Sequence, residues 1–164
     1  MRASPYSNAN CRPWPLPVAF RQMSDPAKPS SPGRSFSDPV SAYFGLVFET
    51  PELVRMPIGQ AVINGAGILS GVATYAMVDY CMGSALWAQI EPEQERIATV
   101  SISINYVQTA VEGEALCRTS VDRRNRTLAV MRSSVEHTDG RLLATAIGNY
   151  SIFPARRLEK FARP

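Results

Sequence analysis

Apolar residues in this sequence follow two different periods along the chain. Between residues 68 and 89 almost every position is apolar, which predicts one long helix buried on nearly all sides. Beyond Pro92, apolar and polar residues alternate, as is typical of half-buried strands. This alternation predicts four strands, over residues 97–107, 114–122, 128–137 and 142–153.

Short segments rich in Gly, Asn, Asp and Arg separate the predicted strands, at residues 111–113, 123–126 and 138–140. Parallel neighbours need a long crossover, so strands joined by such short turns are expected to pair as an antiparallel meander. One curved sheet of this kind, wrapped around one apolar helix, would bury both. The predicted fold class is therefore α+β.

The segment before the long helix gives weaker signals. Asp38 followed by Pro39 predicts the start of a short helix that ends near Phe44. Residues 46–58 are predicted to be extended chain interrupted by two prolines, and residues 59–67 to be a loop.

The domain organisation that follows is simple. Residues 1–36 are rich in Pro and Ser without a periodic apolar face, which predicts a disordered tail. They carry no secretory signal, and Met23 is an alternative start that would make residues 1–22 an untranslated extension. We expect one folded domain over residues 37–156 and a C-terminal tail over residues 157–164.

Composition narrows the function. The 164 residues suit one domain, and a net charge of +3 gives no reason to expect a nucleic-acid partner. The odd number of cysteines and the absence of C-x-x-C spacing predict no disulfide framework and no metal site, and favour a reducing, cytoplasmic compartment. His137 is the only histidine, which leaves little room for histidine-based catalysis. No cofactor is expected.

Two other interpretations of the apolar stretch are less favoured. Asp79 is the only charge between residues 61 and 90, so a membrane span would place a carboxylate at a cost of roughly 2.5–3.5 kcal/mol, without basic residues at its flanks. Gly65, Gly67 and Gly71 resemble a dinucleotide fingerprint, but the third glycine is one place late and hairpins follow it. We expect neither a membrane span nor a dinucleotide site.

Two groups on the long helix can support hydrolytic chemistry. The unpaired amides near Gly71 carry partial positive charge and can stabilise an oxyanion. Asp79 supplies a carboxylate that can deprotonate a water. The two are eight residues apart, about 12 Å of helix rise, and an attacking water must lie within roughly 3–3.5 Å of the carbonyl. If both groups act, they come from two subunits, and the site lies at a dimer interface.

The sequence around these two groups resembles that of a known protein family. The run from Asn64 to Asp79 is similar to the helix signature of hotdog-fold acyl-CoA thioesterases of the phenylacetate-pathway type. Residues 99–106, 123–127 and 139–152 also resemble strands and turns of that family. The signature positions that match without a gap are Asn64, Gly67, Leu69, Gly71 and Asp79.

The resemblance implies a hotdog fold, an acyl-CoA substrate with a small or medium acyl or aryl group, and a homo-oligomer, either a dimer or a dimer of dimers. It implies that Asn64 and the Gly71 amide hold the thioester oxygen. It also implies that Asp79 of the partner activates water and that Thr99 orients that water. Ser70 stands at the family's histidine position, where it would face the substrate.

The basic segment and the serine leave further interpretations open. Arg123, Arg124 and Arg126 could bind the phosphates of coenzyme A or form a plain solvated turn. Ser70 in place of histidine also fits a binding protein that holds acyl-CoA without hydrolysing it. An acyl-CoA hydratase of related fold is less favoured, because it needs an Asp/His pair and His137 lies on a distant predicted hairpin.

Each candidate also has a purely structural interpretation. Asn64 could close its loop through an Asx-type bond, and Gly71 could permit close packing. Ser70 could cap the helix, and Thr99 could be an ordinary strand residue. Asp79 could be a carboxylate satisfied by nearby hydroxyl or backbone groups.

Overall fold

The structure, a computed structural model, describes residues 38–160 of the chain. The predicted tail at residues 1–36 lies outside the described residues, as does the end of the predicted C-terminal tail. That tail is expected to begin at residue 157, which lies within a short 3-10 helix, η2 (Ala155–Lys160).

The described residues form one long helix, short helical segments and a single antiparallel sheet. The α-helices are α1 (Pro39–Tyr43) and α2 (Gly71–Trp87), and a second 3-10 helix, η1 (Gln60–Val62), precedes α2. The strands are β1 (Val47–Thr50), β2 (Leu53–Pro57), β3 (Glu95–Tyr106), β4 (Glu114–Arg124), β5 (Leu128–His137) and β6 (Leu142–Pro154). This confirms the α+β class and the hotdog arrangement of a central helix against one curved sheet.

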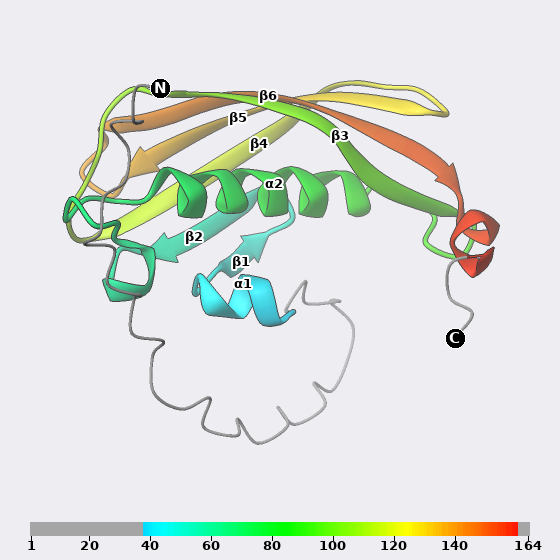
Figure 1. Cartoon of the computed structure of the whole chain (residues 1–164). Helices are drawn as coiled ribbons and strands as arrows, with labels where there is room; N and C mark the ends of the chain where they lie inside the picture. The colour runs from blue at the N-terminus through cyan, green and yellow to red at the C-terminus, as the bar shows by residue number, and fades with distance from the viewer. Residues whose placement is uncertain (1–37, 161–164) are drawn as a thin grey trace, which may run out of the picture. The chain divides into compact units, whose positions relative to one another are not determined.

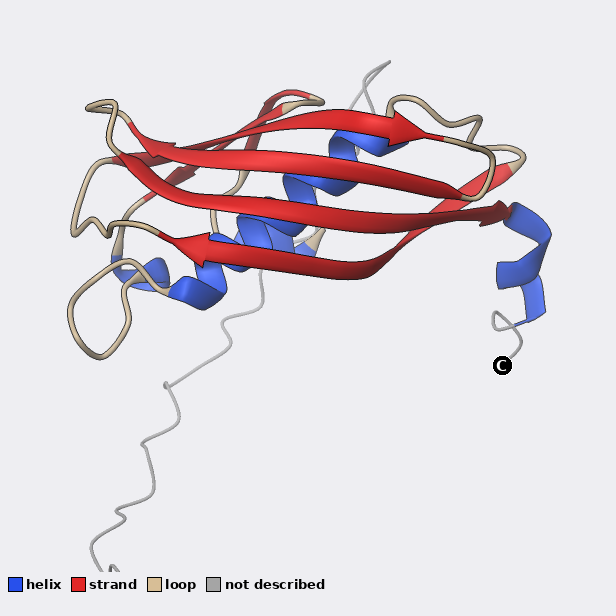
Figure 2. Cartoon of the chain, turned by 90° about the horizontal axis from the view of Figure 1, so that it is seen from above, coloured by secondary structure: helices blue, strands red, loops and turns tan. Residues whose placement is uncertain are grey.

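Helix α2 lies against one face of the sheet, and the strands cross over it (Figures 1 and 2). Its apolar side chains pack into the core together with those of the strands, and burial contributes about 1.5–3 kcal/mol for each large side chain. The buried residues of α2 are Ala73, Thr74, Met77, Val78, Cys81, Met82, Ser84, Ala85 and Leu86. No helix among the described residues is long and apolar enough to cross a membrane.

Close contact between helix and sheet depends on a glycine in β6. A Cβ atom at Gly148 would lie 2.5 Å from Sδ of Met82, so only glycine lets the Met82 side chain occupy its place without a shift. Met82 is fully buried. Gly148 therefore brings β6 close to the middle of α2.

The order of the strands corrects the predicted meander. Strands β4, β5 and β6 do form consecutive hairpins, but the order across the sheet is β1-β2-β4-β5-β6-β3. Strand β3 pairs with β6 and not with β4, and the other edge of β4 is taken by β2. Residues 107–113 must cross three strand spacings, about 14 Å, which is within the roughly 23 Å that such a segment can reach.

Two element boundaries also differ from the prediction. Strand β4 continues to Arg124, so the turn that was predicted at residues 123–126 begins at Asn125. The side-chain oxygen of Asn125 accepts hydrogen bonds from the amides of Thr127 and Leu128, which fixes the turn there. Helix α2 begins at Gly71 instead of residue 68, because Leu69 forms a β-bridge with Ile63.

A hydrogen-bonded aspartate joins the two α-helices. The Asp38 carboxylate accepts from the amides of Val40 (2.8 Å) and Ser41 (3.1 Å) at the start of α1. It also accepts from the Tyr80 hydroxyl (2.8 Å) on α2. Burial acts to raise the pKa of Asp38, but these hydrogen bonds outweigh it and lower that pKa. The same carboxylate and burial raise the pKa of Tyr80 to about 12.

We expect Asp38→Ala to lower the free energy of unfolding at pH 7 by about 1–2 kcal/mol, because the cap of α1 is lost. The pKa of Asp38 is lower in the folded state, so its contribution is present above about pH 4 and is lost as the pH falls through the folded pKa. Urea unfolding at pH 7 and at about pH 3 measures this, with Asp38→Asn as a capping control. Equal stability of wild type and Asp38→Ala at pH 7 would contradict the assignment.

Candidate active site

The loop before α2 presents hydrogen-bond donors toward a cavity. The side-chain oxygen of Asn64 accepts from the amides of Ala66 (2.9 Å) and Ile68 (3.4 Å), which closes the loop. The amide nitrogen of the Asn64 side chain makes no hydrogen bond among the described residues. It is available to donate, as are the first amides of α2, beginning at Gly71.

A cavity of about 210 Å³ adjoins this loop and is lined by Asn64, Gly71, Thr74 and Tyr106 among other residues. The Tyr106 hydroxyl donates to the carbonyl of Gly71 (2.9 Å), so β3 holds the first turn of α2. A Cβ atom at Gly71 would lie 3.3 Å from the Tyr106 ring, which is tight. Glycine thus serves close packing here as well as leaving the amide accessible.

Asp79 lies further along the same helix, beside a second cavity. Its side chain accepts hydrogen bonds from two hydroxyl groups. The Thr99 hydroxyl donates to Oδ1 of Asp79 at 2.8 Å. The Tyr150 hydroxyl donates to the same Oδ1 and to the Asp79 carbonyl (3.1 Å). Burial, followed by the contact with Asp79, raises the pKa of the Tyr150 phenol. The phenol is therefore a donor at any physiological pH.

A β-bulge in β3 turns Thr99 toward the helix. Thr99 pairs with Tyr150 and Ser101 pairs with Asn149, so Val100 is an extra residue. Before the bulge, odd-numbered residues of β3 such as Thr99 face α2. After it, even-numbered residues such as Ile102 do, since Ile102 pairs with Gly148. Ser101 hydrogen-bonds Asn149 on the opposite face (3.2 Å).

The cavity beside Asp79 measures about 190 Å³ and is lined by Asp79, Tyr80, Gly83, Ile97, Ala98, Thr99 and Tyr150. It holds one carboxylate and no basic side chain. Among the described residues no group of three or more His, Cys, Asp or Glu side chains could hold a metal ion. The chemistry available at this cavity is that of a carboxylate supported by hydroxyl groups.

Within one chain the four predicted catalytic residues thus form two groups. Asn64 and Gly71 line the first cavity, and Asp79 and Thr99 line the second. Gly71 and Asp79 both lie on α2, eight residues apart. At a rise of about 1.5 Å per residue, the helix keeps the two groups about 12 Å apart. One thioester cannot contact both groups of a single chain.

Ser70 occupies the N-cap position of α2, but its side chain makes no capping hydrogen bond. Its backbone carbonyl and amide make the hydrogen bonds at this position instead. The Ser70 carbonyl accepts from the amide (3.0 Å) and the hydroxyl (3.1 Å) of Thr74, and its amide donates to the Val62 carbonyl (2.8 Å). The side chain is half-buried at the start of the helix, beside Gly71.

The three arginines lie at the end of the sheet that carries Thr99 and Tyr150. Strand pairing places Arg124, Ala129, Tyr150 and Thr99 in one row across four strands. Arg124 forms an ion pair with Glu95 (3.0 Å) at the start of β3. Arg123 precedes Arg124 on β4 and Arg126 lies in the following turn, and both are exposed.

His137 lies away from both cavities, at the end of β5. Its ring contacts the Asp139 carboxylate (2.9 Å) and the Glu112 carbonyl (2.9 Å). No predicted site residue is within this cluster. The geometry therefore offers no Asp79/His pair of the kind that a hydratase needs.

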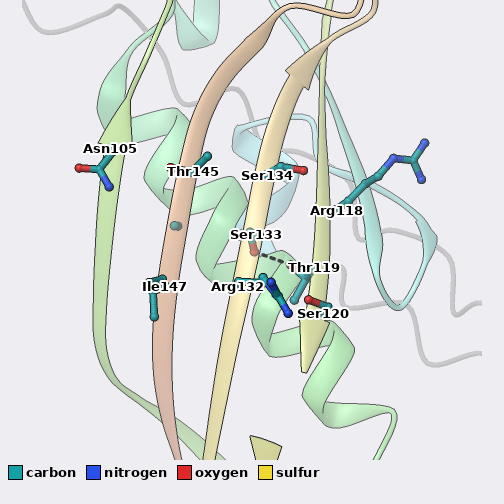
Figure 3. Close-up of a pocket in the computed structure, with 10 residues that line it drawn as sticks. Asn105, Arg118, Thr119, Ser120, Arg132, Ser133, Ser134, Thr145 and Ile147 are labelled. Atoms are coloured by element: carbon teal, nitrogen blue, oxygen red, sulfur yellow. Dashed lines mark hydrogen bonds between the residues drawn. The ribbon is translucent and has the colours of Figure 1, made fainter. Parts of the chain in front are cut away.

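The largest hollow described, about 470 Å³, lies on the other face of the sheet (Figure 3). Arg118 and Arg132 extend from it in different directions, and Arg132 is paired with Asp122 (2.7 Å). Beneath, the hydroxyls of Thr119 and Ser133 hydrogen-bond each other (2.6 Å). No predicted catalytic residue lines this hollow, so its size does not make it the active site.

Sequence reasoning missed Tyr106 and Tyr150. Both looked like ordinary strand aromatics, and their contacts depend on pairings between distant strands. One signal was present for the bulge, because the apolar phase of β3 changes from Ile97 to Ile102 and Ile104. That change of phase predicts a bulge next to Thr99.

Comparison with known sequences is consistent with this geometry. Residues 66–144 match the sequence model of the thioesterase superfamily, and this segment contains Gly71, Asp79 and Thr99. None of the curated proteins searched matches the chain.

Solved structures with the same architecture cover about seven-tenths of the chain. A thioesterase from Pseudomonas aeruginosa is 18% identical with a TM-score of 0.68, over 70% of this chain and 86% of its own. A Bacillus halodurans protein, solved with CoA, is 19% identical with a TM-score of 0.67, over 72% and 78%. A conserved P. aeruginosa protein is 25% identical with a TM-score of 0.66, over 71% and 95%.

The matched segment covers α2 and β3, which carry Gly71, Asp79 and Thr99, and Asn64 lies just before it. The chain therefore has the hotdog fold of these solved structures, and residues 66–144 are similar in sequence to the thioesterase superfamily.

Proposed function

We propose that the chain is an acyl-CoA thioesterase of the phenylacetate-pathway type, which hydrolyses a small or medium acyl or aryl thioester at the interface of a homodimer. The observation that carries this proposal is the separation of the donor group and the carboxylate along α2. Asn64 and Gly71 of one chain would bind the thioester oxygen, and Asp79 of its partner would activate water.

The surface next to these residues suits a second copy of the chain. Strand β3 is an edge strand in the described sheet, so its outer backbone groups have no strand partner. Val100 on this strand is 62% exposed, and Val72 at the start of α2 is 73% exposed. An edge strand flanked by exposed valines is a surface that pairing with another chain would bury.

Symmetry then explains how the two groups could meet. In a two-fold dimer the same patch is used by both subunits. Tyr75 is exposed and lies midway between Gly71 and Asp79 on α2. If the axis passes close to Tyr75 and the two helices run antiparallel, Gly71 of each chain faces Asp79 of the other. One dimer then contains two complete sites.

The proposed reaction uses only groups of the protein and water. The Asp79 carboxylate accepts a proton from water as the water oxygen attacks the thioester carbonyl. The Asn64 amide and the backbone amide of Gly71 donate to the oxyanion that forms. When the carbon–sulfur bond breaks, the thiolate takes up the proton from Asp79, which restores the carboxylate.

The same proposal includes an acyl-CoA substrate, a role for the arginines in binding it, and a cytoplasmic location. The Bacillus halodurans structure solved with CoA supports an acyl-CoA substrate. Arg123 and Arg126 are exposed and could bind CoA phosphates, whereas Arg124 would first have to leave Glu95. The free thiols of Cys81 and Cys117 suit the cytoplasm.

We expect Asp79→Asn to lower the rate of thiol release from acyl-CoA substrates by about 10²–10⁴-fold, because the general base is lost. The amide oxygen can still accept from Thr99 and Tyr150, so the melting temperature should change little. Release of free CoA from a panel of acyl and aryl thioesters measures the rate. Undiminished release by the variant would overturn the role of Asp79.

The same panel tests the binding-protein alternative that Ser70 motivates. That alternative would be favoured if acyl-CoA binds the wild-type protein tightly and raises its melting temperature, but no thiol is released. A Ser70→His variant provides the comparison, because it restores the family's residue at that position.

A site shared between chains predicts complementation. Asn64→Ala and Asp79→Asn homodimers should each be impaired, whereas a co-expressed mixture should recover up to about one quarter of wild-type activity. Half of the dimers would be mixed, and each mixed dimer has one intact site of two. Differently tagged chains allow the mixed dimer to be purified and assayed. Absence of recovery in purified mixed dimers would place the site within one chain.

A further inference from the structure

The hydrogen bonds to the Asp79 side chain are unevenly divided between its two oxygens. Oδ1 accepts from the Thr99 hydroxyl at 2.8 Å and from the Tyr150 hydroxyl. Oδ2 accepts no hydrogen bond from the described residues. The carboxylate is therefore anchored through one oxygen, and the other is left for a ligand or water.

Tyr150 is the more rigid of the two anchors. Its side chain is almost completely buried, with the residue 2% exposed, and it stands on β6 in the interior of the sheet. Its hydroxyl also donates to the backbone carbonyl of Asp79 at 3.1 Å, which ties the phenol to the helix as well as to the side chain. Thr99, by contrast, is an exposed residue on the edge strand β3.

We propose that Tyr150 is a positioning residue for the thioesterase reaction: its hydroxyl, together with Thr99, fixes Oδ1 of Asp79 so that Oδ2 faces the cavity as the base. This inference rests on the proposed function, because it assigns a purpose to Tyr150 only if Asp79 activates water. It also gives Thr99 a direct role in holding the carboxylate.

The surroundings of Asp79 offer no other group to hold its side chain. The cavity lining contains no Lys, Arg or His, and the Tyr80 hydroxyl is engaged by Asp38. Among the described residues, the hydrogen bonds that orient the carboxylate come from Thr99 and Tyr150.

Removing the phenol should therefore impair alignment. The carboxylate gains freedom to rotate, which lowers the fraction of complexes in which Oδ2 is aligned for attack. Substrate binding through the loop and helix start of the other subunit is untouched.

The test is steady-state kinetics of Tyr150→Phe. We expect kcat to fall by about tenfold or more with KM changed by less than about twofold, because substrate binding is retained and alignment is lost. Unchanged kcat, or a rise in KM that accounts for the whole loss of activity, would overturn the inference.

Thr119→Val is the matched structural control. It also removes a hydroxyl from a buried hydrogen bond, the one with Ser133, on the same face of the sheet but away from Asp79. We expect it to lower the melting temperature while kcat changes by less than about twofold. A fall of kcat in Thr119→Val equal to that in Tyr150→Phe would show a general structural effect and overturn the inference.

Two further variants keep the outcomes distinct. Asp79→Asn with full activity contradicts the proposed function itself, whereas inactive Asp79→Asn beside an unaffected Tyr150→Phe contradicts only the positioning role. If Tyr150→Phe does not fold, Thr99→Val and Thr99→Ser test the same anchor. We expect a lower kcat in the first and rescue in the second, and equal behaviour of the two would overturn the inference.

Discussion

A single rigid helix determines how this protein can work, because α2 carries both the donor group at Gly71 and the carboxylate of Asp79. The helix cannot bend the two together, since each residue adds about 1.5 Å to their separation. Burial of α2 against the sheet fixes it further, through Met77, Met82 and Leu86 in the core. If both groups act on one thioester, as proposed, the same burial that stabilises the fold leaves association of two chains as the route to a complete site.

Much of this architecture could be predicted from the sequence. The unbroken apolar run predicted α2, and alternation predicted the last three strands to within a few residues. Strand order could not be predicted, because periodicity shows which face of a strand is buried but not which strand lies beside it. The pairing of β3 with β6 depends on contacts between residues about 50 positions apart, such as Thr99 and Tyr150.

The candidate site, like the fold, could be predicted from the sequence only in part. Asn64, Gly71 and Asp79 could be found because their chemistry and spacing are visible within one short segment. The structure places them beside two cavities, Asn64 and Gly71 at the first and Asp79 at the second. Tyr106 and Tyr150 could not, because a strand tyrosine becomes informative only when the atom that its hydroxyl meets is known. The hydroxyl of Tyr106 meets the Gly71 carbonyl, and that of Tyr150 meets Asp79.

The bulge at Val100 has a consequence for how chains associate. A regular, open edge strand accepts other strands in many registers and can extend into fibres. An irregular edge is selective, since a second strand must accommodate the extra residue at one place. The local distortion that turns Thr99 toward Asp79 therefore also discourages indiscriminate growth at that edge, so one extra residue affects both the surroundings of Asp79 and the way in which chains can associate.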